Sequence, residues 1–247
     1  MMSFKNSSPK FLLIFDFDGT IIDKDSEEEL LKNIFSKEEF DEIMENLENL
    51  EFFEGFNYYF KKMKDIGLTL KDVDANLEKF ELSPKIEVLL NYLKINKSNY
   101  RIVICSSGLD YSIKYILKYH GFLDIIDDFI CTKGYIEDEN SEKLLNIPKN
   151  QFPNSCSLCG PSQCKSTELK KYLEKNNNKY KKILFVCDGS NDFCPSKKIL
   201  KKGDVLFPRI DNNLYKKLFK DNFKNELICQ IYPWKSADEI VQKLKIL

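Results

Sequence analysis

The stretch Phe11-Leu12-Leu13-Ile14-Phe15-Asp16-Phe17-Asp18-Gly19-Thr20 decides the fold of this chain of 247 residues. Its first half, residues 11–15, is an unbroken apolar run, which is typical of a central strand in a parallel sheet covered on both faces. Asp16 and Asp18 follow that strand directly, and side chains at alternate positions face the same way. Ligands of open parallel sheets bind at the carboxyl ends of the strands, so both aspartates are candidate site residues.

Further apolar runs of the same form predict more parallel strands. Residues 101–105 end at Ser106, and residues 182–187 end at the loop Asp188-Gly189-Ser190-Asn191-Asp192. Shorter strands are predicted around residues 205–207 and 227–231. Helical patterns lie between these runs, so the sequence predicts an α/β fold with a doubly wound parallel sheet. Ser106, Asp188 and Asp192 should then reach the same sheet edge as the first pair of aspartates.

Residues 24–82 differ from the rest because they show helical periodicity and many charges but no convincing strand. Ser26 and Glu29 have the spacing of a capping box at the start of the first helix of this segment. We interpret the segment as a small, all-helical cap inserted between the first two strands. Residues 1–23 and 83–247 then form the core domain.

Composition and charge exclude several classes of function. The chain has 38 Lys+Arg against 39 Asp+Glu, and a net charge of -1 argues against nucleic acid or an anionic membrane as the main partner. No apolar run approaches the roughly 18 residues of a transmembrane helix, and the amino terminus lacks the apolar stretch of a signal peptide, so a cytoplasmic location is expected. The single histidine, His120, excludes multi-histidine metal sites, so hydrolytic chemistry is expected to use carboxylates. Monomer and homodimer both remain open.

The four aspartates at the predicted sheet edge favour a metal site. Carboxylates this close repel one another unless a cation neutralises them, and hard oxygen ligands select Mg²⁺. A single aspartate of this kind is at least as often a helix cap or a turn residue. The whole set is harder to explain in that way, so Asp16, Asp18, Asp188 and Asp192 are the predicted metal-binding residues.

The order of these residues resembles the haloacid-dehalogenase-like (HAD) superfamily over nearly the whole chain. Asp16 to Thr20 look like its first motif, and Ser106, Lys165 and the 188–192 loop look like the second, third and fourth. The resemblance implies a Rossmann-like core with a type-one cap. A closer likeness is to the phosphoethanolamine/phosphocholine phosphatase and pyridoxal-phosphate phosphatase family. It is carried by Cys156-Ser157-Leu158-Cys159, Cys164-Lys165, the run DGSNDFCP at residues 188–195, Phe207-Pro208-Arg209 and Trp234.

The resemblance implies a phosphatase that hydrolyses a small phosphorylated metabolite. Asp16 would be the nucleophile that forms an aspartyl-phosphate, and Asp18 would act as general acid and then as general base. Ser106 and Lys165 would hold the phosphoryl oxygens. The family's Mg²⁺ would be held by the Asp16 carboxylate, the Asp18 backbone carbonyl and Asp188, with Asp192 nearby or acting through water.

The second motif departs from the closer family, which usually has Ser-Asp-small-Asn where this chain has Ser106-Ser107-Gly108-Leu109. The missing acid is thought to face the substrate headgroup, and Glu27 falls where the family has another headgroup acid. The substrate-binding candidates are Glu27, Ser106, Ser107, Gly108 and Lys165. The resemblance implies pyridoxal phosphate or a phosphoethanolamine-like or phosphocholine-like compound as substrate. Because Glu27 is the only headgroup carboxylate left, we expect a broader specificity than the choline-type members have, with pyridoxal phosphate or small sugar and polyol phosphates hydrolysed at least as well as phosphocholine.

Two other functions remain open. One is hydrolysis of a keto-sugar phosphate of the methionine-salvage type, or of phosphoserine. The other is a catalytically silent binding scaffold of the same fold, although such a relative would tend to lose Asp16 or Asp18.

The cysteines suggest a second, weaker possibility of metal binding. Cys156, Cys159 and Cys164 have the spacing of the start of a zinc site, but a closed site takes four ligands, and Cys131 could supply the fourth. The alternative is that they are structural thiols around the third motif. Eight cysteines without a secretory signal are expected to be reduced, and Cys194 is expected to be a small buried apolar group.

Overall fold

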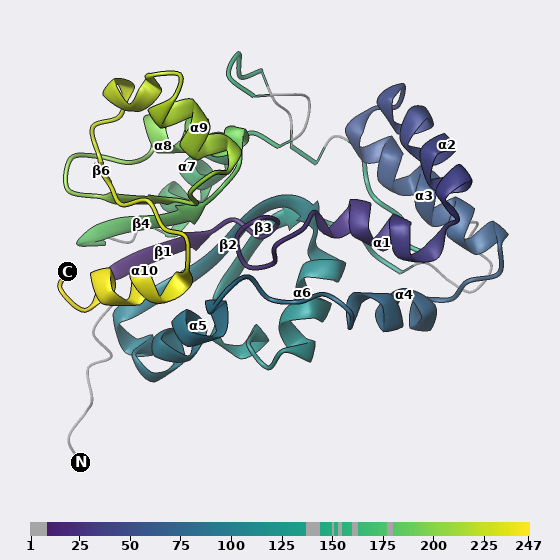
Figure 1. Cartoon of the computed structure of the whole chain (residues 1–247), viewed down its shortest axis with the longest axis horizontal. Helices are drawn as coiled ribbons and strands as arrows, with labels where there is room; N and C mark the ends of the chain where they lie inside the picture. Colours follow the sequence, from purple (N-terminus) through teal and green to yellow (C-terminus); the bar gives the residue numbers. More distant parts are fainter. Residues whose placement is uncertain (1–8, 137–143, 150, 153–154, 160–162, 177–179) are drawn as a thin grey trace.

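The computed structural model describes residues 9–136, 144–149, 151–152, 155–159, 163–176 and 180–247. Its centre is a six-stranded parallel sheet with the strand order β3-β2-β1-β4-β5-β6 (Figure 1). The strands are β1 (Phe11–Phe15), β2 (Tyr100–Leu109), β3 (Asp128–Thr132), β4 (Lys182–Cys187), β5 (Val205–Pro208) and β6 (Gln230–Ile231). The predicted doubly wound α/β fold is therefore confirmed, with β3 as a strand that the sequence analysis did not predict.

Ten α-helices and four short 3₁₀ helices are found in the described part of the chain. The α-helices are α1 (Ser26–Ile34), α2 (Lys37–Glu48), α3 (Phe52–Asp65), α4 (Leu70–Leu77), α5 (Ile86–Ile95), α6 (Asp110–Tyr119), α7 (Lys165–Asn176), α8 (Phe193–Lys198), α9 (Asn213–Phe219) and α10 (Ala237–Leu244). The 3₁₀ helices are η1 (Lys97–Asn99), η2 (Leu123–Ile125), η3 (Ser190–Asp192) and η4 (Phe223–Glu226).

Helices cover both faces of the sheet. Alternate side chains of β1 belong to two separate cores, with Leu13 and Phe15 in one and Leu12 and Ile14 in the other. The first core contains side chains of α5, α6 and α10, and the second contains side chains of α7, α8 and α9. All five residues of β1 are buried, and burial stabilises each apolar side chain by about 1.5–3 kcal/mol. This two-sided burial explains the unbroken apolar run.

Helices α1 to α4 form a group beyond the carboxyl ends of the strands (Figure 1). The two connections to this group, before α1 and after α4, are paired by an antiparallel bridge between Ile22 and Leu82. The predicted start of α1 is wrong in one detail. The helix is capped by Asp25 rather than Ser26, because the Asp25 carboxylate accepts a hydrogen bond of 2.9 Å from the backbone N–H of Glu28.

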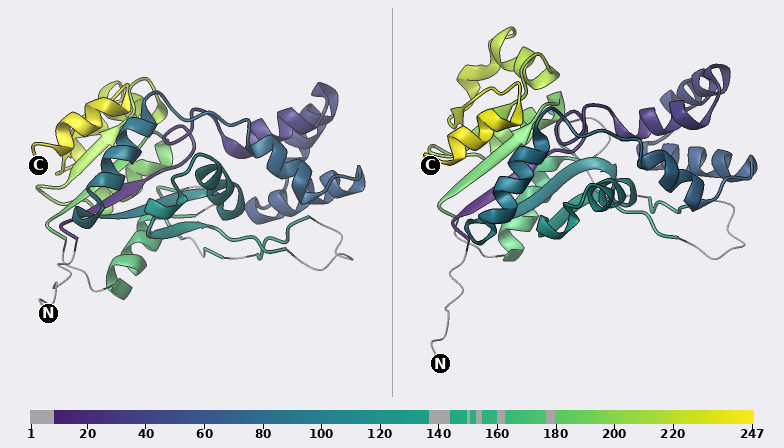
Figure 2. Two further views of the ribbon diagram at one scale, coloured as in Figure 1. Left: turned by 90° about the horizontal axis from the view of Figure 1, so that it is seen from below. Right: turned by 60° about the horizontal axis from the view of Figure 1, so that its bottom comes forward.

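A further segment reaches this helical group from the sheet (Figure 2). After β3 the chain extends toward α3, and Tyr135 and Asn146 pair their backbones within it. Asn57 of α3 donates its Nδ2 to the carbonyl of Ile147 at 2.8 Å and accepts the N–H of Ile147 at 3.0 Å. The helical group is thus tied to the sheet at a second place. Within the described ranges, no helix combines the length and apolarity needed to cross a membrane.

Candidate active site

Three carboxylates meet at the carboxyl edge of the sheet. Asp16 directly follows β1, Asp188 directly follows β4, and Asp192 ends η3. One oxygen of each lies within 4.8 Å of an oxygen of the others. Strands β1 and β4 are direct neighbours in register, with Phe15 opposite Val186, so their ends place these side chains together.

Lys165, the first residue of α7, lies fully buried between two of these carboxylates. Its Nζ is 2.8 Å from Asp16 Oδ2 and 2.7 Å from Asp192 Oδ1. Burial alone would lower the pKa of Lys165, but Asp16 and Asp192 outweigh it and raise the pKa well above its usual value. The other Asp192 oxygen accepts the N–H of Gly189 at 3.0 Å, so both of its oxygens already have protein partners.

This cluster fits a divalent cation. With every group ionised, three carboxylates against one ammonium leave two negative charges. Burial, and after it the charge of Asp16, raise the pKa of Asp188 to about 6. Asp188 is oriented by Thr20 Oγ1 at 3.3 Å and Asn212 Nδ2 at 2.9 Å. Hard oxygen donors of this kind suit Mg²⁺.

Gly19 packs directly against this carboxylate cluster. Its φ is +66°, and a Cβ there would lie 2.3 Å from Asp188 Oδ2, so the Asp188 carboxylate would have to shift. Glycine is therefore favoured here both for its backbone angle and for the space that it leaves to Asp188.

Gly19→Ala is therefore expected to lower kcat by about 10²-fold, because a displacement near 1 Å of a reacting group costs that much. Gly121→Ala is the matched control, since Gly121 has a φ of +77° and no atom within 4 Å of the added Cβ. Each variant should lose about 1–2 kcal/mol of stability from backbone strain alone. Steady-state kinetics and urea denaturation measure both effects, and equal kcat values for the two variants would contradict the assigned role of Asp188.

The second motif lies against Asp18. Ser106 Oγ accepts the N–H of Gly108 at 3.1 Å, and a Cβ on Gly108 would lie 3.2 Å from Asp18 Oδ2 and 3.3 Å from Ser106 Oγ. The other oxygen of Asp18 accepts the N–H of Ser26 at 2.9 Å. Burial, and next the charge of Glu27, raise the pKa of Asp18 well above its ordinary value. Asp18 is thus suited to carry a proton.

Glu27 connects α1 to the end of β2. Its Oε1 accepts the N–H of Leu109 at 3.0 Å, and its Oε2 accepts the Ser26 hydroxyl at 2.9 Å. Burial, and after it the charge of Asp25, raise the pKa of Glu27 to about 7.

A cavity of about 220 Å³ opens beside Asp18 and Glu27. Its lining residues are Asp18, Asp25, Glu27, Leu47, Leu50, Glu51, Phe52, Gly55, Phe56, Tyr59, Ser107 and Gly108. Asp25 and Glu51 line the same cavity, so Glu27 is not its only acidic residue from the helical group. Asp18, Asp25 and Ser107 also line a second cavity, of about 350 Å³, which contains Asp16 and Asp188. The two cavities therefore adjoin at Asp18.

The hydroxyl of Tyr59 has no hydrogen-bond partner among the residues that the structure describes. Tyr59 is 3% exposed and lines the cavity beside Glu27. A buried hydroxyl without a partner costs about 1–3 kcal/mol, so the site has one polar group that a ligand could satisfy.

Sequence reasoning missed Arg209, Asn212, Asp25 and Glu51 as candidate functional residues. The first two follow β5, so the rule for strand ends was enough to find them. Arg209 donates to the carbonyl of Gly19 at 2.7 Å, pairs with Asp23, and lies over the ring of Trp234. It therefore holds the connection that leads from β1 into α1. His120 lies elsewhere, at the end of α6, with its Nε2 2.8 Å from the carbonyl of Phe80.

The cysteine prediction is wrong about the fourth thiol. Cys156, Cys159 and Cys164 lie together with Cys194, and all four sulfur atoms are within 4.8 Å of one another. Cys131 is buried in β3 and is not in this group. Cys194 comes next to the other three because α8 packs beside α7, a tertiary contact that sequence spacing does not reveal.

The family model described as Putative Phosphatase matches residues 11–247. The chain is 29% identical over 242 residues to pyridoxal phosphate phosphatase PHOSPHO2 of Mus musculus, which covers 96% of this chain and 98% of that protein. It is 28% identical over 249 residues to phosphoethanolamine/phosphocholine phosphatase of Gallus gallus, covering 97% and 89%.

Solved structures share the fold. A phospho-aspartyl intermediate analogue of phosphoserine phosphatase superposes with a TM-score of 0.59 at 18% identity, covering 96% of this chain and 99% of that one. A substrate-bound phosphoserine phosphatase superposes with a TM-score of 0.60 at 17% identity, covering 96% and 99%. At these identities the structures bear on the fold alone. Together with the family match and the curated relatives, the fold leads to one conclusion: this chain belongs to the Putative Phosphatase family and is an HAD-type phosphatase, a hydrolase of phosphomonoesters.

Proposed function

We propose that this enzyme is a magnesium-dependent phosphatase that hydrolyses a small phosphomonoester through an aspartyl-phosphate on Asp16. The observation that carries the proposal is the placement of Asp16. Its carboxylate ends the central strand, lies against the buried ammonium of Lys165, and shares a cavity with Asp18, Ser106 and Asp188. The proposed nucleophile and the proposed proton carrier thus line one cavity, and the proposed phosphate-binding cation, Lys165, lies 2.8 Å from the nucleophile.

The reaction would proceed in two displacements. In the first, an oxygen of Asp16 bonds to phosphorus while the ester bond breaks, and Asp18 gives a proton to the departing alcohol oxygen. In the second, Asp18 takes a proton from water, the water oxygen bonds to phosphorus, and inorganic phosphate leaves Asp16 as a free carboxylate. The raised pKa of Asp18, caused first by burial and then by Glu27, supports the proton-carrying role in both steps.

The phosphoryl oxygens would be held by Lys165 and Ser106, with the Gly108 backbone close to both the serine and Asp18. Asp16, the backbone carbonyl of Asp18 and Asp188 are the proposed ligands of Mg²⁺, with Asp192 acting through water because its own oxygens bind Lys165 and Gly189. When bound, the cation would neutralise phosphate charge and lower the repulsion between the substrate and its nucleophile.

The leaving group would occupy the cavity beside Glu27. Three carboxylates of that cavity, Asp25, Glu27 and Glu51, favour a cationic group, and the rings of Phe52, Phe56 and Tyr59 favour a flat or methylated one. Phosphocholine, phosphoethanolamine and pyridoxal phosphate each match one or both features. Residues 24–82 are the proposed cap over this group, with residues 1–23 and 83–247 as the core. A cytoplasmic location stays a prediction.

A panel of phosphomonoesters, assayed with and without a chelator, tests this function. We expect hydrolysis that needs Mg²⁺, with kcat/KM for phosphocholine, phosphoethanolamine or pyridoxal phosphate at least tenfold above that for 3-phosphoglycerate, or about 1.4 kcal/mol in transition-state binding. 3-Phosphoglycerate is the control because its leaving group is an anion. A preference for it, for phosphoserine or for a keto-sugar phosphate would overturn the assigned substrate class. Activity that survives chelation would overturn the metal.

Tyr59→Phe tests whether the cavity holds the leaving group. Removing a hydroxyl that has no hydrogen-bond partner in the described part of the chain should leave stability unchanged or raise it by about 1 kcal/mol. If that hydroxyl binds the substrate, kcat/KM should fall about fivefold, which corresponds to one hydrogen bond of about 1 kcal/mol. Tyr58→Phe on the same helix is the matched control and should leave kcat/KM unchanged, since Tyr58 does not line the cavity. Equal kcat/KM values for the two variants would contradict a role of Tyr59 in substrate binding.

A further inference from the structure

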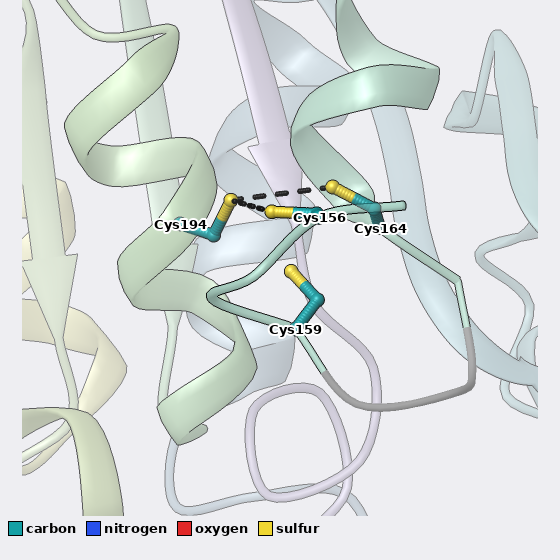
Figure 3. Close-up of side chains that lie close together, drawn as sticks. All are labelled: Cys156, Cys159, Cys164 and Cys194. Atoms are coloured by element: carbon teal, nitrogen blue, oxygen red, sulfur yellow. Dashed lines mark hydrogen bonds between the residues drawn. The ribbon is translucent and has the colours of Figure 1, made fainter. Parts of the chain in front are cut away.

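A compact group of four cysteines lies outside the carboxylate site (Figure 3). Cys156 and Cys159 lie in the segment that precedes α7, Cys164 directly precedes α7, and Cys194 lies in the first turn of α8. Figure 3 shows their sulfur atoms directed toward a common centre. Three segments of the chain, one of them distant in sequence, thus contribute thiols to one place.

The distances between the sulfur atoms fit a tetrahedral metal site. With Zn–S bonds of about 2.3 Å, the sulfur atoms of a four-thiolate site are separated by about 3.8 Å. The Sγ of Cys194 is 3.6 Å from that of Cys156 and 4.0 Å from that of Cys164, and every pair in the group is within 4.8 Å. A disulfide needs about 2.05 Å and could join only two of the four.

The surroundings suit a site with excess negative charge. Four thiolates around a divalent cation leave a charge of −2, and the ammonium of Lys198 lies 3.0 Å from the Sγ of Cys156. The hydroxyl of Ser166 lies 3.2 Å from the sulfur atoms of both Cys164 and Cys194. Hydrogen bonds of this kind to ligating sulfur hold the ligands of metal sites in place.

We propose that Cys156, Cys159, Cys164 and Cys194 bind one structural zinc ion. Soft thiolate ligands in a four-sulfur tetrahedral arrangement select zinc or iron, and zinc is the usual occupant of sites that begin with Cys-x₂-Cys. Four protein ligands leave no open position for a substrate, so the ion has no part in the chemistry.

The zinc would fix the positions of two active-site residues relative to each other. Cys164 immediately precedes Lys165, and Cys194 lies two residues after Asp192, which is the buried partner of that lysine. The ion would therefore join the start of α7 to the start of α8 and position Lys165 against Asp192. The cysteines are positioning residues and touch no substrate.

Metal analysis of the untagged protein, purified without added metal or chelator, tests the proposal. We expect one zinc per chain in the wild type, and zinc near zero in Cys159→Ser and Cys194→Ser. Cys229→Ser and Cys131→Ala are the matched controls, since both cysteines lie outside the group, and both should keep their zinc. Asp188→Asn should also keep it, which separates this ion from one bound to the carboxylates.

Two further readouts do not depend on activity. Cobalt substituted into the wild type should show the sulfur-to-metal charge-transfer bands of a four-thiolate site, and Cys194→Ser should lack them. Removal of zinc should lower Tm for the wild type but not for Cys194→Ser. A wild type that holds no zinc, holds iron instead, or contains only six titratable thiols out of eight after denaturation would overturn the proposal. None of these results would affect the proposed hydrolysis, which rests on other residues.

Discussion

Asp16→Asn is expected to abolish turnover, with a fall in kcat on the order of 10⁴-fold or more, as for other enzymes that lose their nucleophile. The amide has nearly the same size and shape as the carboxylate but cannot form a bond to phosphorus. The fold should persist because Lys165 keeps its second partner, Asp192, at 2.7 Å. KM should change far less than kcat, since Asp16 does not line the cavity that we propose for the leaving group.

The measurement is single-turnover hydrolysis of the best substrate of the panel, with the intact mass checked to exclude deamidation. Asp65→Asn is the matched control, because it removes the same charge from the exposed surface of α3. It should behave as the wild type does. The wild-type enzyme, quenched during turnover, should carry a phosphoryl group that Asp16→Asn lacks. Retention of more than a few percent of wild-type activity would contradict the covalent step.

Lys165→Met is expected to remove activity and to destabilise the fold by about 3–5 kcal/mol, the usual cost of leaving a buried charge without its partner. The lysine is fully buried between Asp16 and Asp192, and no other described cation forms an ion pair with either of them. Lys171→Met on the exposed side of α7 is the matched control and should change stability by no more than about 0.5 kcal/mol.

A second substitution identifies the cause. The double variant Lys165→Met/Asp192→Asn removes one of the two carboxylates that Lys165→Met leaves without a cation. Urea denaturation should therefore show that much of the lost stability returns, while activity does not. Equal stabilities of the single and the double variant would contradict the buried ion pairs.

The stability of Lys165→Met should also depend on pH. Burial, and next the charge of Asp16, already raise the pKa of Asp192 well above its ordinary value, and loss of the lysine raises it further. A carboxyl group whose pKa is higher in the folded than in the unfolded protein contributes its full stabilisation below about pH 3.9, the pKa of an aspartate in the unfolded chain. That stabilisation is lost as the pH rises through the pKa of the group in the folded protein. The difference in the free energy of unfolding between the wild type and Lys165→Met should therefore grow from acidic to neutral pH. A difference that shrinks over this range would contradict the assignment.

The sequence was sufficient to predict the centre of the sheet. Strands β1 and β4 are buried on both faces, so their apolar runs have no polar alternation and could be recognised without any partner. Strand β3 was missed because it is an edge strand in which only Cys131 and Thr132 are fully buried. Its sequence, Asp128-Phe129-Ile130-Cys131-Thr132, mixes charge and apolar character as a loop also can.

In the candidate site, too, the sequence could predict some residues but not others. Asp16, Asp18, Ser106 and Asp188 could be predicted because parallel strands bring their carboxyl ends to one edge, whatever the rest of the chain does. Asp25 and Glu51 could not, because their place in the cavity beside Asp18 depends on how α1 and α3 pack above the sheet. Local pattern indicates that a residue lies on a helix, but the packing of that helix decides which other residues it meets.

The sequence by itself thus determined the centre of the parallel sheet, the helical insert and the acidic strand ends, since all three follow from burial and from backbone geometry near each residue. Only the tertiary structure decided that Lys165 lies between two carboxylates, that Arg209 holds the connection from β1 to α1, and that Cys194 rather than Cys131 joins the other three thiols. Each of these contacts joins segments far apart in the chain. The physical reason is that such contacts are set by the packing of helices and loops around the sheet, which local sequence patterns do not encode.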